Sequence, residues 1–305
     1  MTVSPVSEGE IGERTGSRTL QILASSVSSQ ILRALSGGPL GLTELGDDLG
    51  SAIQIPGRDA GSLEAKITPS GREMLFVSTV LEDWLEKAPG GVLPFGGDGA
   101  TEAVEALAGS WSSTMLHTLA AGPRSRTELS RFGDVAGYSS TERCLEAMQL
   151  AGQVEARNAD GEGAAYSVTD WLREGLAPIV AAARMERRHL VDAPPVAPLD
   201  AEAAFMLSLP LLRLPADLSG SCCLTVEMTG GGVPRRGGAM VRVEEGRIVS
   251  CTPRLEGDPD AWATGDLNAW FSTVIDSDAG PMEVGGDEDI AGVLLAGLHE
   301  VLFGV

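Results

Sequence analysis

Residues that build catalytic and metal sites are scarce in this sequence. Its 305 residues include only three histidines, His117, His189 and His299, and these fall in three different predicted helices. No H-x-x-x-H, C-x-x-C, G-x-S-x-G or G-x-x-x-x-G-K-[ST] pattern occurs. The sequence therefore assigns no catalytic residue and gives no reason to expect a resident metal or cofactor. Catalysis is a minor alternative. It would take place in a ligand cavity, whose residues follow no recognisable spacing in the sequence.

Cysteine is equally sparse, with Cys144, Cys222, Cys223 and Cys251. Only Cys222 and Cys223 are neighbours, and consecutive side chains on a strand point to opposite faces, so these two cannot hold one metal together. No cation is placed in the sequence to stabilise a thiolate. We expect all four cysteines to be small buried hydrophobic side chains.

Basic residues are too few to balance the acidic ones. Lys and Arg number 22 against 43 Asp and Glu, which gives a net charge of −21. The excess is −6 over residues 1–100 (7 − 13), −3 over 101–190 (9 − 12) and −12 over 191–305 (6 − 18). Because every region is acidic, non-specific attraction to nucleic acid or to anionic lipid surfaces is not favoured.

Long apolar runs are missing too. The first residues, "MTVSPVSEGEIGERTGSR", are polar and lack the apolar core of a signal peptide. No apolar run elsewhere reaches the length that crosses a membrane. These features predict a cytoplasmic protein that makes no membrane contact, with residues 1–18 disordered.

What the sequence does contain is an internal repeat. Residues 38–45 read "GPLGLTEL" and residues 122–129 read "GPRSRTEL", an offset of 84 (122 − 38). In both copies the preceding segment has apolar residues at helical spacing, and the Gly-Pro pair ends that helix. Thr43 and Thr127 can each cap the helix that follows. The shared register favours a duplicated module over chance.

The second copy continues through a recognisable order of elements. We predict a second helix at Arg126–Phe132, a turn at Gly133–Gly137 and a third helix at Ser139–Ala151. A β-hairpin with an acidic, Gly-rich tip follows over residues 152–170, and a closing helix spans Trp171–Arg188. Helix, helix–turn–helix, hairpin and helix is the order of a winged helix.

The second copy resembles the HxlR-type winged-helix regulators, which are relatives of the MarR group. The resemblance rests on Trp111, Leu116, Gly122-Pro123, Thr127–Leu129, Met148–Arg157 and Tyr166–Leu176. It implies DNA binding through the third helix and the hairpin. The candidate DNA contacts are Arg124, Arg126, Ser139, Ser140, Thr141, Arg143 and Arg157. The alternative is that these residues form a solvated surface, because the hairpin tip at Asp160–Glu162 has the wrong charge for a phosphate backbone.

The first copy keeps both ends of this pattern and lacks its middle. Its segment Ile67–Leu85 resembles the hairpin exit and closing helix of the same family, with Thr68 matching Thr169 at an offset of 101. The upstream offset is 84, so 17 residues (101 − 84) are missing, and these correspond to the turn and third helix. Two short strands, Ala52–Ile55 and Leu63–Ile67, are predicted in the remainder. The first copy is therefore expected to be a winged helix without its recognition helix.

Linkers rich in Pro and Gly divide the chain. The predicted organisation is a disordered segment at 1–18, a degenerate winged helix at 19–88, a linker at 89–100, a complete winged helix at 101–190, a linker at 191–200 and a third domain at 201–305. The fold class expected is α+β, with two winged-helix domains in tandem followed by a sheet domain.

The third domain is predicted to begin with a helix at Ala201–Leu212 and a strand at Ser221–Met228. A hairpin turning at Glu245-Gly246, a short strand at Ala261–Thr264, a helix at Asp266–Ile275 and a final strand–turn–helix complete it. This order, with its Gly-Asp turns at residues 265–266 and 286–287, resembles the sterol-carrier-protein type 2 fold.

That resemblance implies an apolar tunnel that binds lipid-like molecules. The candidate lining residues are Phe205, Met206, Leu209, Leu224, Val226, Met240, Trp262, Trp270 and Phe271. Arg213, Arg242 or Ser250 could anchor a polar group of the ligand. Ordinary core packing is the alternative for each of these apolar residues.

The leading hypothesis is a ligand-responsive winged-helix transcriptional regulator. An apolar small molecule would bind the third domain and shift the population of arrangements of the winged-helix pair. Its partners would be double-stranded DNA and that ligand, with an intrachain pseudo-dimer of winged helices and a possible homodimer. The rival hypothesis is a winged-helix-derived protein that no longer binds DNA and serves as a small-molecule-binding or biosynthetic accessory.

Overall fold

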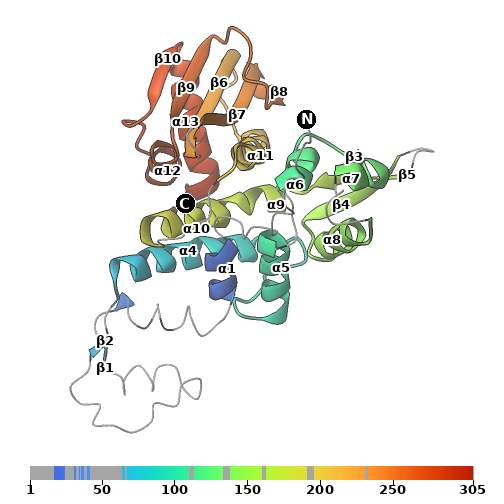
Figure 1. Cartoon of the computed structure of the whole chain (residues 1–305), viewed down its shortest axis with the longest axis vertical. Coiled ribbons are helices and arrows are strands. Elements are labelled where there is room, and N and C mark those ends of the chain that lie inside the picture. The colour runs from blue at the N-terminus through green and yellow to red at the C-terminus, as the bar shows by residue number, and fades with distance from the viewer. Residues whose placement is uncertain are drawn as a thin grey trace, which may run out of the picture.

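The computed structural model describes residues 17–24, 31, 34, 36–37, 40–41, 64–65, 67–109, 113–132, 138–159, 163–190, 196–230 and 233–304. The fold is α+β: an N-terminal helical region with a small three-stranded sheet precedes a five-stranded mixed sheet with its own helices. Figure 1 shows the five-stranded sheet at one end of the molecule, followed by successive layers of helices. Within the described ranges, no helix is long and apolar enough to cross a membrane.

The N-terminal region opens with α1 (Ser17–Ala24), which begins two residues inside the segment predicted to be disordered. Two long helices pass through its centre, α4 (Pro69–Glu86) and α10 (Leu176–His189). The others are α5 (Asp98–Gly109), α6 (Ser113–Ala120), α7 (Arg126–Phe132), α8 (Tyr138–Leu150) and α9 (Asp170–Glu174).

The three-stranded sheet has the order β3–β5–β4, from β3 (Arg124–Ser125), β4 (Val154–Ala159) and β5 (Gly163–Val168). The predicted order of helix, helix, helix, hairpin and helix is therefore present between residues 113 and 189. The predicted closing helix differs in one respect, because it is divided at Gly175 into α9 and α10. Pro178 has no N–H to donate to the carbonyl of Glu174, so a continuous helix would lack that bond.

Several predicted features lie outside the described residues. These are residues 1–16, Trp111, the strand at Ala52–Ile55, the turn at Gly133–Gly137, the hairpin tip at Asp160–Glu162 and residues 191–195 of the second linker.

Both halves of the repeat contain the same strand pairing. In the first half, β1 (Leu40–Gly41) pairs with β2 (Glu64–Ala65), and Leu40 lies opposite Ala65. In the second half, Arg124 of β3 lies opposite Tyr166 of β5. The first members of these pairs differ by 84 (124 − 40) and the second by 101 (166 − 65). These are the two offsets that align the sequence, so the strand register reproduces the alignment on both sides of the 17-residue gap.

The helix starts repeat in the same way. Thr68 caps α4 by accepting the N–H of Gly71 at 3.1 Å, and Thr169 caps α9 by accepting the N–H of Leu172 at 3.2 Å. Both the caps and the groups that they bind are separated by 101 positions (169 − 68; 172 − 71). The cap geometry therefore follows the sequence alignment at the level of single hydrogen bonds.

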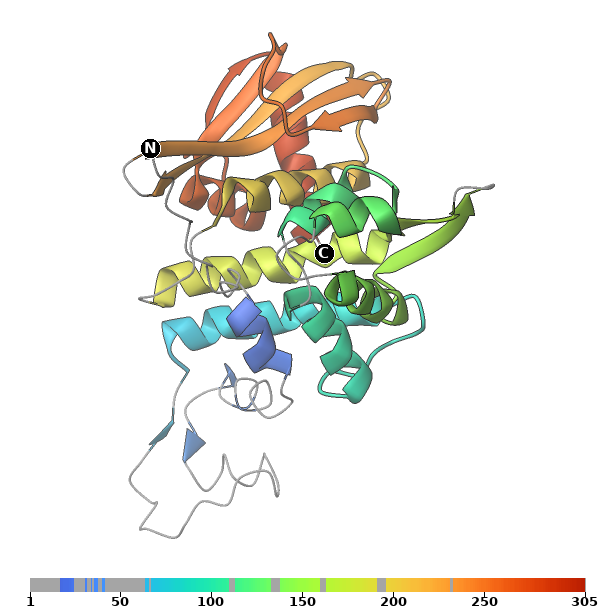
Figure 2. The same ribbon diagram turned by 45° about the vertical axis from the view of Figure 1, so that its right-hand side comes forward.

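Helices α4 and α10 pack side by side and run in opposite directions (Figure 2). Arg188 at the end of α10 binds Glu73 near the start of α4 at 2.9 Å. At the other end, Lys87 after α4 lies 3.4 Å from Glu174 of α9. Glu73 corresponds to Glu174, and Lys87 corresponds to Arg188, each at an offset of 101 positions (174 − 73; 188 − 87). A contact between i and j that recurs between j and i is the pattern of a two-fold interface.

The C-terminal unit contains a sheet with the strand order β10–β9–β6–β7–β8. Its strands are β6 (Gly220–Gly230), β7 (Val233–Glu244), β8 (Arg247–Thr252), β9 (Ala261–Asp266) and β10 (Glu283–Gly286). Strands β6 and β9 are parallel, and the other neighbours are antiparallel. The predicted hairpin turn is confirmed at Glu245-Gly246, where both residues have positive φ (49° and 70°).

Three helices cover one face of this sheet: α11 (Pro198–Ser208), α12 (Leu267–Asp276) and α13 (Glu288–Phe303) (Figure 1). A short 3₁₀ turn, η3 (Leu209–Leu211), extends α11. Asp266 caps α12 and Asp287 caps α13, as carboxylates at helix starts should. Cys222, Leu224 and Val226 point from β6 into the covered face and are buried. Trp262 on β9 belongs to the opposite face and is 39% exposed.

Candidate ligand-binding site

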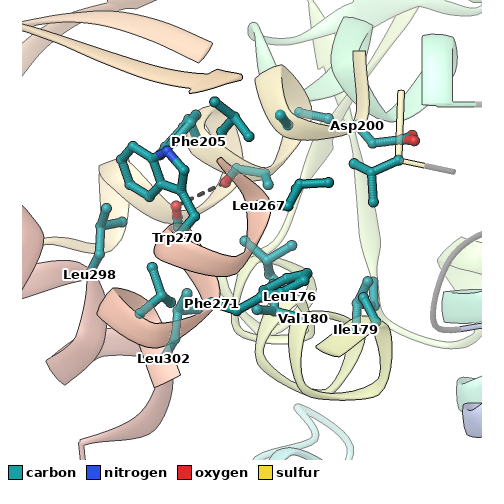
Figure 3. Close-up of a pocket in the computed structure, with 18 of the residues that line it drawn as sticks. Leu176, Ile179, Val180, Asp200, Phe205, Leu267, Trp270, Phe271, Leu298 and Leu302 are labelled. Atoms are coloured by element: carbon teal, nitrogen blue, oxygen red, sulfur yellow. Dashed lines mark hydrogen bonds between the residues drawn. The ribbon is translucent and has the colours of Figure 1, made fainter. Parts of the chain in front are cut away.

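An apolar cavity of about 170 Å³ lies where the N-terminal region meets the C-terminal unit (Figure 3). Its wall consists of α10 from the N-terminal region and of α11, α12 and α13 from the C-terminal unit. Leu116 of α6, Val196 ahead of α11 and Val226 of β6 also line it. The lining residues are Leu116, Leu176, Ile179, Val180, Ala183, Val196, Asp200, Ala201, Ala203, Ala204, Phe205, Ser208, Val226, Leu267, Trp270, Phe271, Val274, Leu298 and Leu302.

The aromatic part of the wall is held in place by a hydrogen bond and a ring contact. The indole Nε1 of Trp270 donates to the carbonyl of Thr225 on β6 at 2.8 Å. The ring of Phe205 meets that of Trp270 edge to face, with centroids 4.8 Å apart. Edge-to-face pairs are a preferred aromatic geometry, so these two side chains form a fixed surface between α11 and α12.

The two polar lining residues already make bonds within α11. The hydroxyl of Ser208 donates to the carbonyl of Ala204 at 2.8 Å. The carboxylate of Asp200 accepts the N–H of Ala197 at 2.9 Å, at the start of the helix. Among the lining residues that the structure describes, Asp200 alone has an ionisable side chain. The interior of the cavity is accordingly hydrocarbon, which suits an apolar ligand.

Two arginines connect the N-terminal region to the helices around the cavity. Arg184 of α10 binds Asp276 at the end of α12 through both guanidinium Nη atoms, each at 2.9 Å. Arg173 of α9 donates to the carbonyls of Met206 and Leu207 at the end of α11, at 3.0 and 3.2 Å. Burial lowers the pKa of Arg173, whereas Asp170 raises it. These contacts attach the C-terminal unit on both α11 and α12.

A third contact between the units joins His117 of α6 to Glu202 of α11. The imidazole Nε2 lies 3.4 Å from the Glu202 carboxylate, and each side chain is about four-fifths buried. Burial lowers the pKa of His117 and raises the pKa of Glu202. Both shifts favour the neutral forms, so desolvation outweighs ion pairing here.

Of the nine apolar residues proposed from the sequence, the structure places four at the cavity: Phe205, Val226, Trp270 and Phe271. The other five are Met206, Leu209, Leu224, Met240 and Trp262. Met206, Leu209 and Leu224 are buried in the two cores instead. Met240 and Trp262 share the far face of the sheet, where each lies opposite Cys223.

None of the suggested polar anchors lines the cavity. Arg213, Arg242 and Ser250 are exposed, and Arg242 binds Glu244 at 2.9 Å.

The sequence interpretation missed the wall contributed by α10. Leu176, Ile179, Val180 and Ala183 recur at the i, i+3, i+4, i+7 spacing of one helix face. That stripe is visible in the sequence, but it indicates only that α10 packs against something. Its partner is the C-terminal unit, and this docking is not encoded locally.

Several of the proposed DNA contacts are engaged within the protein. Arg126 binds Glu142 of α8 at 2.6 Å and the hydroxyl of Tyr166 at 3.1 Å. Arg157 lies 2.7 Å from Glu155 on the same strand. Arg124 is 3.9 Å from Glu128, and the Glu128 pKa is lowered first by its hydrogen bonds to Ser125. These carboxylates offset part of the positive charge that would attract DNA.

The remaining proposed DNA contacts lie on α8. Arg143 is exposed and Thr141 is buried. Ser139 and Ser140 lie in the first turn of α8, and their side chains are outside what the structure describes.

The thiols of Cys222, which is buried, and of Cys251, which is half-buried, are unreactive at neutral pH. Burial raises the pKa of Cys222 and of Cys251 to about 12 in each case, so both stay protonated at neutral pH. Cys223 is half-buried, and the Cys144 side chain lies outside the described residues. In the part of the chain that the structure describes, no group of three or more His, Cys, Asp or Glu is arranged to hold a metal ion.

Comparison of the sequence with protein-family models and with curated proteins gives no match in either case.

Proposed function

We propose that this protein binds an apolar small molecule in the cavity between α10 and the helices of the C-terminal unit, and that binding controls the arrangement of a winged-helix pair. The observation that carries this proposal is the composition of the cavity wall. Of the 19 described residues that line it, only Asp200 and Ser208 are polar, and both make hydrogen bonds within the protein.

The position of the cavity supports a regulatory role. A ligand there contacts α10, the closing helix of the second repeat half, together with α11 and α12. Since α10 also packs against α4 of the first half, a shift of α10 reaches both halves. A ligand changes such an equilibrium only by its different affinity for the two arrangements. Contact with both units provides a source for that difference.

The pairing of α4 with α10 supports the interpretation of the N-terminal region as an intrachain pair of winged helices. Strand registers, helix caps and ion pairs all follow the offsets of 84 and 101. The sterol-carrier-like interpretation of the C-terminal unit is supported by its sheet order and by helices on one face. DNA is the partner that the winged-helix interpretation suggests, and it would be read by α8 of the complete copy alone.

Native mass spectrometry of the purified full-length chain tests the ligand. We expect a bound or titratable apolar molecule that is lost in Ala204→Leu, which adds three carbon atoms to the cavity wall. Ala147→Leu, on the exposed face of α8, is the matched control and should bind normally. Equal occupancy in both variants would place the ligand elsewhere, and no binding at all would remove the proposal.

A second candidate function is a ligand-binding accessory protein that has lost DNA binding. The ion pairs Arg126–Glu142 and Arg157–Glu155 favour it, because they neutralise two of the expected contacts. An electrophoretic mobility shift with the gene's own upstream DNA separates the two. Binding at low salt that weakens as salt rises, and that is lost in Arg143→Ala but kept in Arg254→Ala, supports the regulator. No shift at low salt supports the accessory protein.

A further inference from the structure

The cavity takes its wall from both sides of the junction between the two units. Val180 and Ala183 of α10 line it from the N-terminal region. Phe271 of α12 lines it from the C-terminal unit, and in Figure 3 its ring lies beside Val180, so the two helices meet at the edge of the cavity. A bound molecule makes all of its contacts only while the units are docked. Ligand binding and docking therefore favour the same arrangement.

The contact between α10 and α12 has an apolar part and a charged part. Ala183 of α10 packs with Phe271 and Ile275 of α12 in one buried cluster. Each helix continues with a charged residue, which is Arg184 on α10 and Asp276 on α12. The two guanidinium Nη atoms of Arg184 lie 2.9 Å from the two carboxylate oxygens of Asp276. This docking pair, Arg184 and Asp276, therefore joins the two helices beside residues that line the cavity.

The position of Asp276 in α12 makes it depend on Arg184. Asp276 is the last residue of the helix, where the macrodipole is negative and a carboxylate is unfavourable. A guanidinium at that place offsets the repulsion. Since the Arg184 side chain is only 14% exposed and binds through two nitrogen atoms, the pair is stronger than an ordinary surface ion pair. Separation of α12 from α10 would leave Asp276 without this cation.

The corresponding positions of the first repeat half have a different character. At the offset of 101, the residues of α4 that match the docking face of α10 are polar or acidic. Ser78, Thr79, Glu82 and Asp83 stand in α4 where Ile179, Val180, Ala183 and Arg184 stand in α10. Because Asp83 replaces Arg184, a docked Asp276 would meet a like charge on α4. The contact with α12 is therefore particular to α10 and is not a remainder of the duplication.

We propose that the cavity ligand acts by holding α12 against α10, and that the docking pair sets how readily these helices separate. The ligand and the docking pair stabilise the same docked arrangement, so the loss of either one increases the population in which α12 has moved away from α10. This inference rests on the proposed function, because it names the regulation of the same cavity. It identifies α10 as the helix through which movement of the C-terminal unit reaches the repeat halves.

Amide hydrogen exchange of the full chain, read by mass spectrometry, measures this separation, because amides that the contact protects exchange when it opens. Arg184→Met keeps an aliphatic side chain in the buried part of the contact and removes the charge. We expect it to speed exchange in α12 by about threefold to tenfold, the scale of a well-formed ion pair. Arg187→Met is the matched control, because Arg187 lies on the same helix and is exposed, and it should leave exchange unchanged.

Charge reversal distinguishes the ion pair from simple packing. Arg184→Asp should speed exchange further, because it places a like charge against Asp276. Combining Arg184→Asp with Asp276→Arg should recover most of the protection, whereas a purely steric role predicts no recovery. Unchanged exchange in Arg184→Met, or a double variant that is no better protected than Arg184→Asp, would overturn the role of the docking pair.

Propylbenzene tests the part played by the ligand, since it is apolar and small enough for a cavity of about 170 Å³. At saturation it should slow exchange in α10 and α12 of the wild type. It should not do so in Ala204→Leu, whose larger side chain fills part of the cavity. Binding measured by calorimetry without slower exchange would overturn the inference and leave the cavity as a binding site.

The absence of binding is a separate result. If calorimetry detects no binding of propylbenzene and native mass spectrometry finds no apolar ligand, the proposed function fails. The claim that a ligand holds α12 against α10 fails with it. The comparison of Arg184→Met with Arg187→Met requires no ligand, so it still decides whether the docking pair controls the separation of the helices.

Discussion

Trp84 and Trp171 are joined by two reciprocal hydrogen bonds. The indole Nε1 of Trp84 donates to the carbonyl of Trp171 at 2.7 Å, and the Nε1 of Trp171 donates to the carbonyl of Trp84 at 2.8 Å. Their rings stack with centroids 4.4 Å apart and an angle of 5° between planes. This reciprocal pair joins the end of α4 to α9, so it links the two repeat halves in the centre of the N-terminal core.

Replacing either indole by phenylalanine keeps a ring in the stack and removes one donor. We expect Trp84→Phe to lower the free energy of unfolding by about 1 kcal/mol, because the hydrogen bond from the indole is lost while the Trp171 carbonyl keeps the N–H of Gly175 at 3.0 Å. Trp84→Ala should cost about 3–5 kcal/mol, since it also leaves a cavity. Urea unfolding followed by circular dichroism measures both. Equal losses for Phe and Ala would contradict the importance of the stack.

The caps Thr68 and Thr169 occupy equivalent positions but differ in their surroundings. Thr68 is exposed, whereas the Thr169 hydroxyl also lies 3.0 Å from the carbonyls of Gly152 and Gln153. We expect Thr68→Ala to cost about 1 kcal/mol, as a lost cap does, and Thr169→Ala to cost more. The comparison requires only equilibrium unfolding, and Thr169→Ser, which retains the hydroxyl, should recover most of the loss.

Arg173 and Arg72 form a second matched pair, again 101 positions apart (173 − 72). Arg173 binds the carbonyls at the end of α11, whereas Arg72 is exposed. Arg173→Met should lower the free energy of unfolding by about 2–3 kcal/mol, because hydrogen bonds from a charged donor are lost. Arg72→Met should stay within about 0.5 kcal/mol of the wild type, as exposed substitutions do. Similar values for both would show that Arg173 does not hold the two units together.

The contact between His117 and Glu202 predicts a pH dependence of stability. Burial lowers the pKa of His117 below its ordinary 6.5. Just below pH 6.5 the imidazole is therefore protonated in the unfolded chain but still neutral in the folded chain. Stability should therefore fall as pH drops through 6.5, and His117→Gln should remove this part of the slope. Urea unfolding between pH 5 and 8 measures it, and an unchanged slope in the variant would contradict the prediction.

Glu202 contributes with the opposite sign. Burial raises its pKa above the ordinary 4.5, so the folded chain keeps a proton that the unfolded chain has released. That stabilising contribution is present at acidic pH and is lost as pH rises through the folded pKa. Glu202→Gln should therefore increase stability at neutral pH relative to the wild type, and the gain should shrink below pH 4.5.

Local patterns were sufficient to predict most of the C-terminal secondary structure. Alternation placed Cys222, Leu224 and Val226 on one buried face, and the Glu245-Gly246 turn suits positive φ at both positions. The offset of 101 also matched Thr68 with Thr169, and these two residues cap corresponding helices. The paired strands at Leu40–Gly41 and Arg124–Ser125 were not predicted, and Thr127, which was expected to cap the second helix, lies inside α7. The predicted features depend on residues close together in sequence or on a direct match between two segments.

The cavity could be predicted only in part, because it depends on how two units dock. Apolar periodicity identifies buried positions such as Leu209 and Leu224, but it does not tell which of them borders a void. Trp262 was expected to line the cavity, but it lies on the opposite face of the sheet. Its neighbours Ala261 and Ala263 point into the core, so the largest apolar side chain of the strand lies on the outer face. The Ile179–Val180 wall needed the docked position of α10.

The antiparallel contact of α4 with α10 forms within one chain, and this determines how it depends on protein concentration. Two separate chains joined through such a helix pair would dissociate on dilution. Here both helices belong to one polypeptide, so their association is intramolecular and its equilibrium does not change with protein concentration. The pairing of the two halves is thus the same in a cell with few copies as in one with many, because dilution does not separate them.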